Sequence, residues 1–218
     1  MRILIFSILL VFATTAAGDT RASAHQAVSE TLQELAGAVS DCRLQLAADP
    51  MAVRGLVDHR LRPKADVLYA GQLILGRHWS DADPAQRRRF AEALYSSLVT
   101  RYASGLLLLT PNNVTVAPPS AAQNEGDAEV ELRVHAGLAT PVPVFLQLRS
   151  GNGRWRIYDA RWEGQSYVFS LRNAFAQQIR RDGLETVIGR LEASAGTPAG
   201  PPEERETAAG RCLRARMN

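Results

Sequence analysis

The spacing of apolar residues changes near residue 110, which restricts the fold to one that combines helices with a sheet. Before that point apolar residues recur every three or four positions, as in Phe90, Leu94 and Leu98, and so share one face of a helix. After it, residues 129–135 alternate strictly between polar and apolar, which is the period of a half-buried strand. The sequence therefore predicts an α+β domain.

Proline and glycine residues divide the helical parts of the chain into separate helices. The clearest start is 83–86 (Asp-Pro-Ala-Gln), where Asp can cap the helix, Pro fits its first position and Gln can close a capping box. The four leucines at 106–109 make the last turn of this helix apolar all round, so we expect a deeply buried end. The predicted helices are 25–47, 51–61, 65–78, 84–109, 168–181 and 184–193.

Strands follow one another directly in the middle of the chain. Gly151-Asn152-Gly153 is suited to a tight hairpin turn, and short connections of this kind join antiparallel strands. One face of the sheet is apolar and needs a cover of helices. We therefore predict a curved antiparallel sheet of about four strands covered by several helices. The strands are expected at 113–117, 129–135, 144–149 and 154–160.

The N-terminus is typical of an exported protein. Arg2 precedes an apolar run at 3–12, and the small residues 16–18 follow, which predicts a signal peptide over 1–18. Cleavage after Ala24 is the alternative. The apolar run has about ten residues and is too short to span a bilayer as a helix. We expect the mature protein in the periplasm.

Composition limits the remaining possibilities. The formal charge of +3 is dispersed, so nucleic acid is not expected as a partner. Residues 25–193 are enough for a single domain with a sizeable core. From residue 195 the chain is rich in Gly, Pro, Glu and Arg, with almost no apolar residue before Leu213, so we predict a disordered tail over 195–218.

The two cysteines of an exported protein could form a disulfide. Cys42, however, lies on the apolar face of the predicted 25–47 helix together with Val39 and Leu46. Cys212 lies in the predicted tail, where a fixed geometry would be hard to hold. We therefore expect Cys42 to be a small buried hydrophobic residue and not half of a bridge.

Residue patterns that carry chemistry are weak in this chain. The four histidines have no ligand-like spacing, so neither a metal nor another cofactor is expected. Residues 164–168 look like half of a nucleophile elbow, but the second glycine is missing. Ser166 is better explained as a turn or helix-capping residue. No catalytic residues and no enzymatic activity are predicted.

Short motifs form an ordered series between residues 25 and 193. They are Tyr69-Ala70-Gly71, Leu75-Gly76, Trp79, Pro84-Ala85-Gln86-Arg87, Phe90, Leu98, Tyr102, Trp155-Arg156-Ile157-Tyr158-Asp159, Glu163-Gly164, Ser166, Arg172 and Phe175. This series resembles the MlaC family, also called toluene-tolerance proteins, which are periplasmic phospholipid carriers. The resemblance implies lipid exchange with an inner-membrane ABC transporter that has an MCE-domain subunit, and with an outer-membrane lipoprotein associated with a porin.

For such a carrier we expect an apolar cavity between the apolar face of the sheet and the long helix. A cavity of this kind can hold acyl chains while the headgroup stays in water. Gly71 and Gly76 are expected to permit close packing or a bend. The residues expected to contact lipid are Leu73, Leu94, Leu98 and Tyr102 on helices, and Val130, Leu132, Val144, Leu146 and Leu148 on strands.

Three alternatives stay open at this stage. A hopanoid-associated branch (HpnM) of the same family makes a rigid polycyclic lipid a possible ligand in place of a phospholipid. An envelope enzyme would need a polar cluster such as Asp159, Glu163 and Ser166. A structural adaptor would have its apolar faces packed shut and would bind no ligand.

Overall fold

A computed structural model describes residues 17–110, 112–119, 126–135, 140–196 and 201–217, with side chains from residue 24 to residue 216 within these ranges. The predicted signal peptide lies almost wholly outside the described residues.

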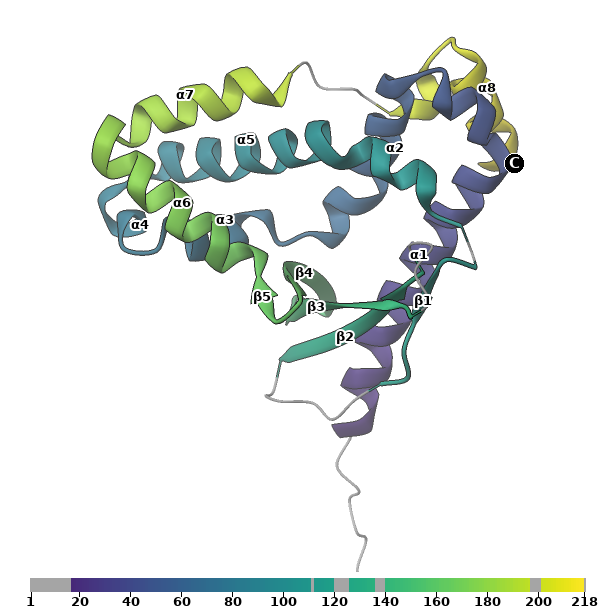
Figure 1. The fold of residues 1–218 in the computed structure, drawn as a ribbon, viewed down its shortest axis with the longest axis horizontal. Helices are drawn as coiled ribbons and strands as arrows, with labels where there is room; N and C mark the ends of the chain where they lie inside the picture. Colours follow the sequence, from purple (N-terminus) through teal and green to yellow (C-terminus); the bar gives the residue numbers. More distant parts are fainter. Residues whose placement is uncertain (1–16, 111, 120–125, 136–139, 197–200, 218) are drawn as a thin grey trace, which may run out of the picture.

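Helices and one antiparallel sheet make up the fold, as the sequence predicts (Figure 1). The α-helices are α1 (Ala17–Ala47), α2 (Pro50–Leu61), α3 (Val67–Leu75), α4 (His78–Asp81), α5 (Pro84–Tyr102), α6 (Tyr167–Asp182), α7 (Leu184–Ala195) and α8 (Ala208–Met217). Three short 3₁₀ segments are η1 (Arg62–Lys64), η2 (Ala103–Leu108) and η3 (Pro202–Glu204).

The sheet has five strands in the order of the sequence, each antiparallel to the next. Four of them match the predicted ones within a few residues, and the fifth is a two-residue strand before α6. A register shift between Gln147 and Leu148 leaves Tyr158 as an extra residue on the neighbouring strand. The strands are β1 (Val114–Val116), β2 (Asp127–Val134), β3 (Val142–Gly151), β4 (Arg154–Trp162) and β5 (Gln165–Ser166).

The elements form a helical layer above the sheet and a long helix beside it. Figure 1 shows α3, α5, α6 and α7 together on one side of the strands, while the N-terminal half of α1 runs along the sheet. Three groups of buried residues correspond to this arrangement. One joins α1, α2, η2 and α8, one joins α3, α5, α6 and α7, and the third joins the sheet to α1.

The start of α5 follows the prediction from its sequence. The Asp83 carboxylate accepts hydrogen bonds from the N–H groups of Ala85 and Gln86, and the Gln86 side chain accepts one from the N–H of Asp83. This is the capping box that the sequence predicts. Two unsatisfied donors of the first turn are paired in this way, which fixes where the helix begins.

The end of α5 differs from the prediction. The α-helix stops at Tyr102 and continues as the 3₁₀ segment η2, so the expected helix to residue 109 is wrong in its last turns. The tighter 3₁₀ winding spreads Leu106, Leu107 and Leu108 around the segment, and Leu109 follows it in an extended conformation. Leu106, Leu107 and Leu109 pack against the α1–α2 core, but Leu108 is 73% exposed. A fully buried end is therefore also wrong.

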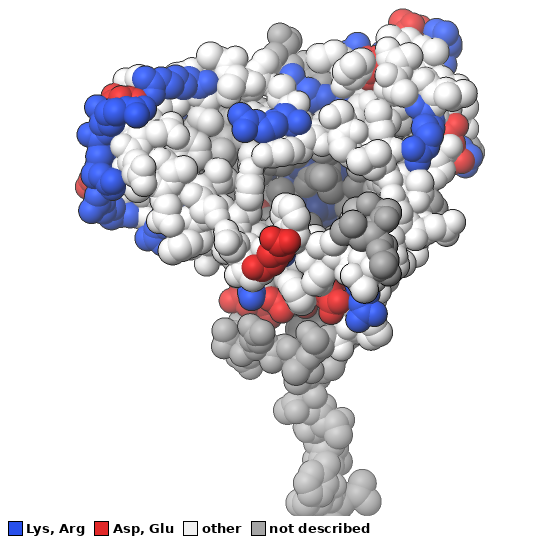
Figure 2. Space-filling model, viewed as in Figure 1, with Lys and Arg blue, Asp and Glu red and all other residues white. Residues whose placement is uncertain are grey.

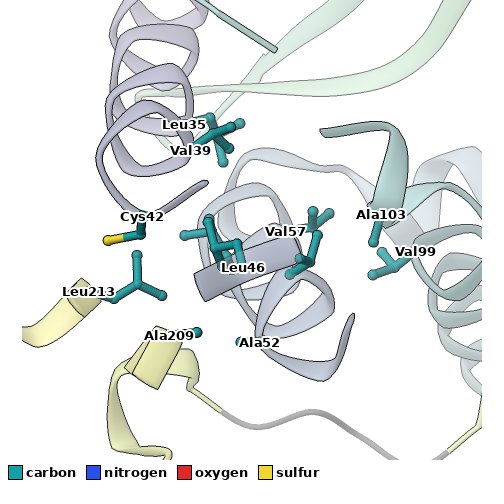
Figure 3. Packing of buried hydrophobic residues seen from close by; sticks show 12 residues of the cluster. Leu35, Val39, Cys42, Leu46, Ala52, Val57, Val99, Ala103, Ala209 and Leu213 are labelled. Atoms are coloured by element: carbon teal, nitrogen blue, oxygen red, sulfur yellow. The ribbon is translucent and has the colours of Figure 1, made fainter. Parts of the chain in front are cut away.

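The C-terminal segment is folded, which corrects the prediction of a disordered tail. Residues 208–217 form α8, whose Ala209 and Leu213 are buried in the core with α1 and α2 (Figure 3). Cys42 and Cys212 form a disulfide that attaches α8 to α1. Cys42 is buried as expected, but it is also half of a bridge. Two apolar residues one turn apart give too weak a pattern to predict a helix. The disulfide holds this segment against the core, although its composition contains few apolar residues.

Candidate functional site: an apolar cavity

A cavity of about 200 Å³ lies between the helical layer and one edge of the sheet. Figure 2 shows this side of the molecule hollowed in the region between the helices and the strands. Most of the cavity wall is aliphatic or aromatic, and it comes from α3, α5, α6 and β4. The residues around it are Ala65, Asp66, Val67, Ala70, Gly71, Ile74, Ala91, Leu94, Tyr95, Leu98, Ile157, Tyr158, Asp159, Ala160, Tyr167, Val168 and Leu171.

The close approach of α3 and α5 forms one wall of the cavity. A Cβ atom at Gly71 would lie 2.8 Å from the Cβ of Ala91 and 3.3 Å from its Cα, which is closer than side chains pack. Glycine is therefore required at this crossing, as the sequence suggested. Gly76 has a φ of 54° and ends α3, so it stops the helix and does not bend it.

The start of α3 is fixed to the sheet through Asp66. The N–H of Asp66 donates to the carbonyl of Ile157 at 2.8 Å, and the Asp66 carboxylate accepts from the N–H of Tyr69 and from Nε of Arg149. The Arg149 guanidinium also lies 4.0 Å from the centre of the Tyr69 ring. The buried carboxylate is thus paired and bonded, and it leaves this wall of the cavity without an uncompensated charge.

The start of α6 is fixed by Asp159 and Ser166, two of the polar residues considered above for an envelope enzyme. Ser166 Oγ accepts from the N–H of Phe169 at 2.9 Å and donates to the Asp159 carboxylate at 2.6 Å. Asp159 also accepts from the N–H of Val168 at 2.9 Å. These bonds cap the helix and satisfy both side chains. The Ser166 hydroxyl donates to a carboxylate and not to an imidazole base, and histidine is absent from the described residues around the cavity.

Two tyrosines meet where the C-terminal end of α5 approaches the start of α6. The Tyr167 hydroxyl donates to the Tyr102 hydroxyl at 3.4 Å, and the Tyr167 ring is part of the cavity wall. Burial, and then the hydrogen bond to Tyr102, raise the pKa of Tyr167 to about 12. The same bond, with a smaller effect of Arg101, lowers the pKa of Tyr102. Because both side chains are more than one third exposed, this pair marks the mouth of the cavity.

The structure divides the residues that we predicted to contact lipid into two groups. Leu94 and Leu98 line the cavity. Tyr102 lies at its mouth, and Leu73 is half-buried on α3 but is not part of the wall. The strand residues do not line it either, because they pack in the cluster between the sheet and α1. They are Val130, Leu132, Val144, Leu146 and Leu148.

This difference has a physical reason. Alternation along a strand shows which residues share a face, but it does not show which helix covers that face. Here Ala24 and Val28 of α1 cover it, and the long helix α5 does not. The sequence-based expectation placed the long helix over this sheet face, whereas the structure places α1 there, and the contact of these strand residues with lipid stays a prediction.

Some cavity residues were not anticipated. Ala70, Ile74 and Leu171 look like ordinary core residues of helices in the sequence. Tyr158 contributes because of the strand irregularity next to it, and its ring packs edge-on against Tyr69, with centroids 5.1 Å apart. The motif 155–159 was the only sequence signal for this part of the wall.

A second hollow of about 420 Å³ lies between α1 and β1. Its wall includes the polar side chains of Ser29, Gln33 and Thr115 as well as Leu32 and Val116. Hydrocarbon is better accommodated where the wall offers few polar groups that would lose water. The smaller cavity between α3, α5, α6 and β4 is therefore the better candidate for an apolar ligand.

The fold and the cavity define a class of protein, an α+β binding domain with an open antiparallel sheet and an apolar site beneath a helical layer. Residues 29–193 match the model of the MlaC protein family, and the chain belongs to that family. It is 21% identical over 194 residues to the intermembrane phospholipid transport system binding protein MlaC of Haemophilus influenzae. The aligned region covers 88% of this chain and 91% of that protein.

A solved structure shows the same fold with a ligand. This chain is similar to the phospholipid-binding protein from Ralstonia solanacearum in complex with a phospholipid, with a TM-score of 0.66 and 27% sequence identity. The match covers 80% of this chain and 96% of that one. The resemblance found in the sequence is thus confirmed, and the α+β fold with it.

Two further observations concern the described part of the chain. None of its helices combines the length and the apolar character that crossing a bilayer requires. Its His, Cys, Asp and Glu side chains form no group of three or more that could hold a metal ion.

Proposed function

We propose that this protein is a periplasmic phospholipid carrier that holds acyl chains in the cavity between α3, α5, α6 and β4. The observation that carries the proposal is this largely apolar cavity in a member of the MlaC family. A structural relative with 27% identity was solved with a phospholipid, which supports the same ligand here. Burial of each methylene contributes about 0.8 kcal/mol, so a lipid gains much by leaving water for such a cavity.

The cavity must widen to hold a whole lipid. Its volume of about 200 Å³ is below the roughly 300–1,000 Å³ of pockets that enclose drug-sized ligands. Ile157 belongs to the cavity wall and also to the cluster between the sheet and α1. We propose that acyl chains separate these layers from Ile157 onward. Val144 and Leu146, which are only partly buried in that cluster, would then contact lipid as first predicted.

The transport route is the wider part of the proposal. The carrier would exchange lipid with an inner-membrane ABC transporter through its MCE-domain subunit and with an outer-membrane lipoprotein–porin complex. Export would follow from the signal peptide. Ala24 is fully buried in the cluster between the sheet and α1, which favours cleavage after Gly18 over cleavage after Ala24.

Native mass spectrometry of the protein purified from the periplasm without detergent tests the ligand. We expect one stoichiometric phospholipid, identified after solvent extraction. A hopanoid would place the protein in the hopanoid-associated branch instead. An empty protein that also takes up no lipid from vesicles would contradict the carrier function and favour a structural adaptor.

Substitution in the cavity tests the site. Leu98→Trp adds a bulky ring to the cavity wall, and we expect it to reduce lipid loading strongly while the protein stays folded. Leu44→Trp is the matched control, because Leu44 is 82% exposed on α1. Leu146→Trp tests whether the cavity widens, because this substitution blocks loading only if lipid reaches the cluster between the sheet and α1. Normal lipid content in a folded Leu98→Trp variant would refute the proposed site.

A further inference from the structure

The inside of the cavity is unsuited to a phosphate group. Its two charged residues are carboxylates, Asp66 and Asp159, and both accept hydrogen bonds from neighbouring groups. A phosphate there would lose its water, and the two carboxylates, which already accept hydrogen bonds, would offer it no donor in return. An amphiphile whose acyl chains fill the cavity therefore has its phosphate at the mouth.

The mouth carries hydrogen-bond donors that are suited to an anion. The oxygen–oxygen distance of 3.4 Å between the Tyr102 and Tyr167 hydroxyls is long compared with about 2.7–2.8 Å for a good O–H···O bond. A charged oxygen between the two tyrosines would give each hydroxyl a stronger acceptor than the other offers. The Tyr102 oxygen accepts the hydrogen bond from Tyr167, so the O–H of Tyr102 is available to donate to a ligand.

A cation stands beside this pair. Arg101 directly precedes Tyr102 in the last turn of α5, its charge lowers the pKa of Tyr102, and it forms no ion pair with a carboxylate among the described residues. Guanidinium groups bind phosphate with two parallel N–H···O bonds. Leu98, one helical turn before Tyr102, lines the cavity, so the polar group and the apolar wall are continuous along one face of α5.

We propose that Arg101, Tyr102 and Tyr167 form a site for the phosphodiester of a glycerophospholipid at the mouth of the cavity. This inference rests on the proposed carrier function and adds the residues that bind the phosphate. The site selects lipids that carry a phosphate over neutral lipids with the same acyl chains. The rest of the headgroup points into solvent, and the protein does not recognise it.

The test is a loading competition between two lipids with identical acyl chains. Vesicles contain equal amounts of dioleoylphosphatidylglycerol and dioleoylglycerol, which lacks the phosphate, and the lipid taken up is measured by mass spectrometry. We expect wild-type protein to prefer the phospholipid by roughly tenfold or more, because a hydrogen bond to a charged group is worth about 1.5–3 kcal/mol. Arg101→Gln and the double variant Tyr102→Phe/Tyr167→Phe should lose most of this preference and still take up lipid.

Controls separate the possible outcomes. Arg88→Gln, an exposed arginine near the other end of α5, should keep the wild-type preference. A wild type that loads both lipids equally, or variants that keep the preference, would overturn the phosphate site and leave the carrier function intact. A wild type that takes up neither lipid would overturn both. Glycerol 3-phosphate at millimolar concentration should not compete, and competition would assign the site to soluble phosphate compounds instead.

Discussion

At the scale of single residues, Gly71 shows how closely the cavity wall is packed. Gly71→Ala places a methyl group against the Cβ and backbone of Ala91, and neither can rotate away. We expect the substitution to lower the free energy of unfolding by about 1–3 kcal/mol, although alanine favours a helix more than glycine does. Urea denaturation followed by circular dichroism measures this change.

Gly189→Ala is the matched control for this helix crossing. Gly189 is exposed within α7, and a Cβ there would have no atom within 4 Å. Alanine should therefore stabilise the protein by about 0.5–1 kcal/mol through its lower backbone entropy in the unfolded chain. If both substitutions had the same effect, the close contact at Gly71 would not limit the distance between α3 and α5.

Single residues also show what could be predicted about the site. Leu94 and Leu98 line the cavity because the helical period selects the face of α5 that turns inward, and their contact with lipid stays a prediction. The packing of Leu146 against α1 was not foreseen, because alternation does not reveal the covering helix, and its contact with lipid stays a prediction. Tyr158 could not be placed at all, since its position depends on a strand irregularity that residue types do not show.

At the scale of elements, an ion-pair network holds α5 against α7. Arg89 donates to both Glu185 and Glu192, with bonds of 2.6 to 2.9 Å. The hydrogen bonds from Arg89 lower the pKa of both glutamates below the ordinary 4.5. The ion pairs therefore contribute stability at pH values above 4.5 and lose it as the pH falls through the lower pKa of the folded state.

The pH dependence of an Arg89→Gln variant tests this network. At pH 6 we expect its melting temperature to lie below that of wild type, and the difference should shrink as the pH falls from 4.5 toward 3. High salt should also reduce the difference, because these side chains are exposed and screened. Arg88→Gln, which removes a neighbouring charge outside the network, should show little dependence. A difference that grows on acidification would contradict this account.

Most of the elements were predictable, and the exceptions share a cause. The capping residues of α5 and the strand alternation at 129–134 are local signals, and both elements begin as predicted within two residues. The end of α5 and the presence of α8 depend on distant contacts instead. The helix α8 packs on α1, and the disulfide joins the two helices across a sequence separation of 170.

At the scale of the whole molecule, the Cys42–Cys212 bond closes most of the chain into a loop, with a sequence separation of 170. Loop-closure entropy grows slowly with length, and for such a loop the chain-entropy model gives a stabilisation of roughly 5 kcal/mol as an upper value. We expect the double variant Cys42→Ala/Cys212→Ala to fold but to unfold at a clearly lower urea concentration. Wild type in reducing agent should behave like the variant, and the variant itself should not respond to reduction.

The same pair of proteins tests whether the core around α8 and the lipid cavity are separate. The disulfide joins α8 to α1, and α8 packs against α1 and α2 (Figure 3), whereas the cavity is formed by α3, α5, α6 and β4 (Figure 1). At a temperature where both proteins are folded, the variant should therefore load phospholipid from vesicles to the same level as wild type. A large loss of loading in the folded variant would show that α1, which also covers the sheet, transmits the release of α8 to the cavity wall at Ile157.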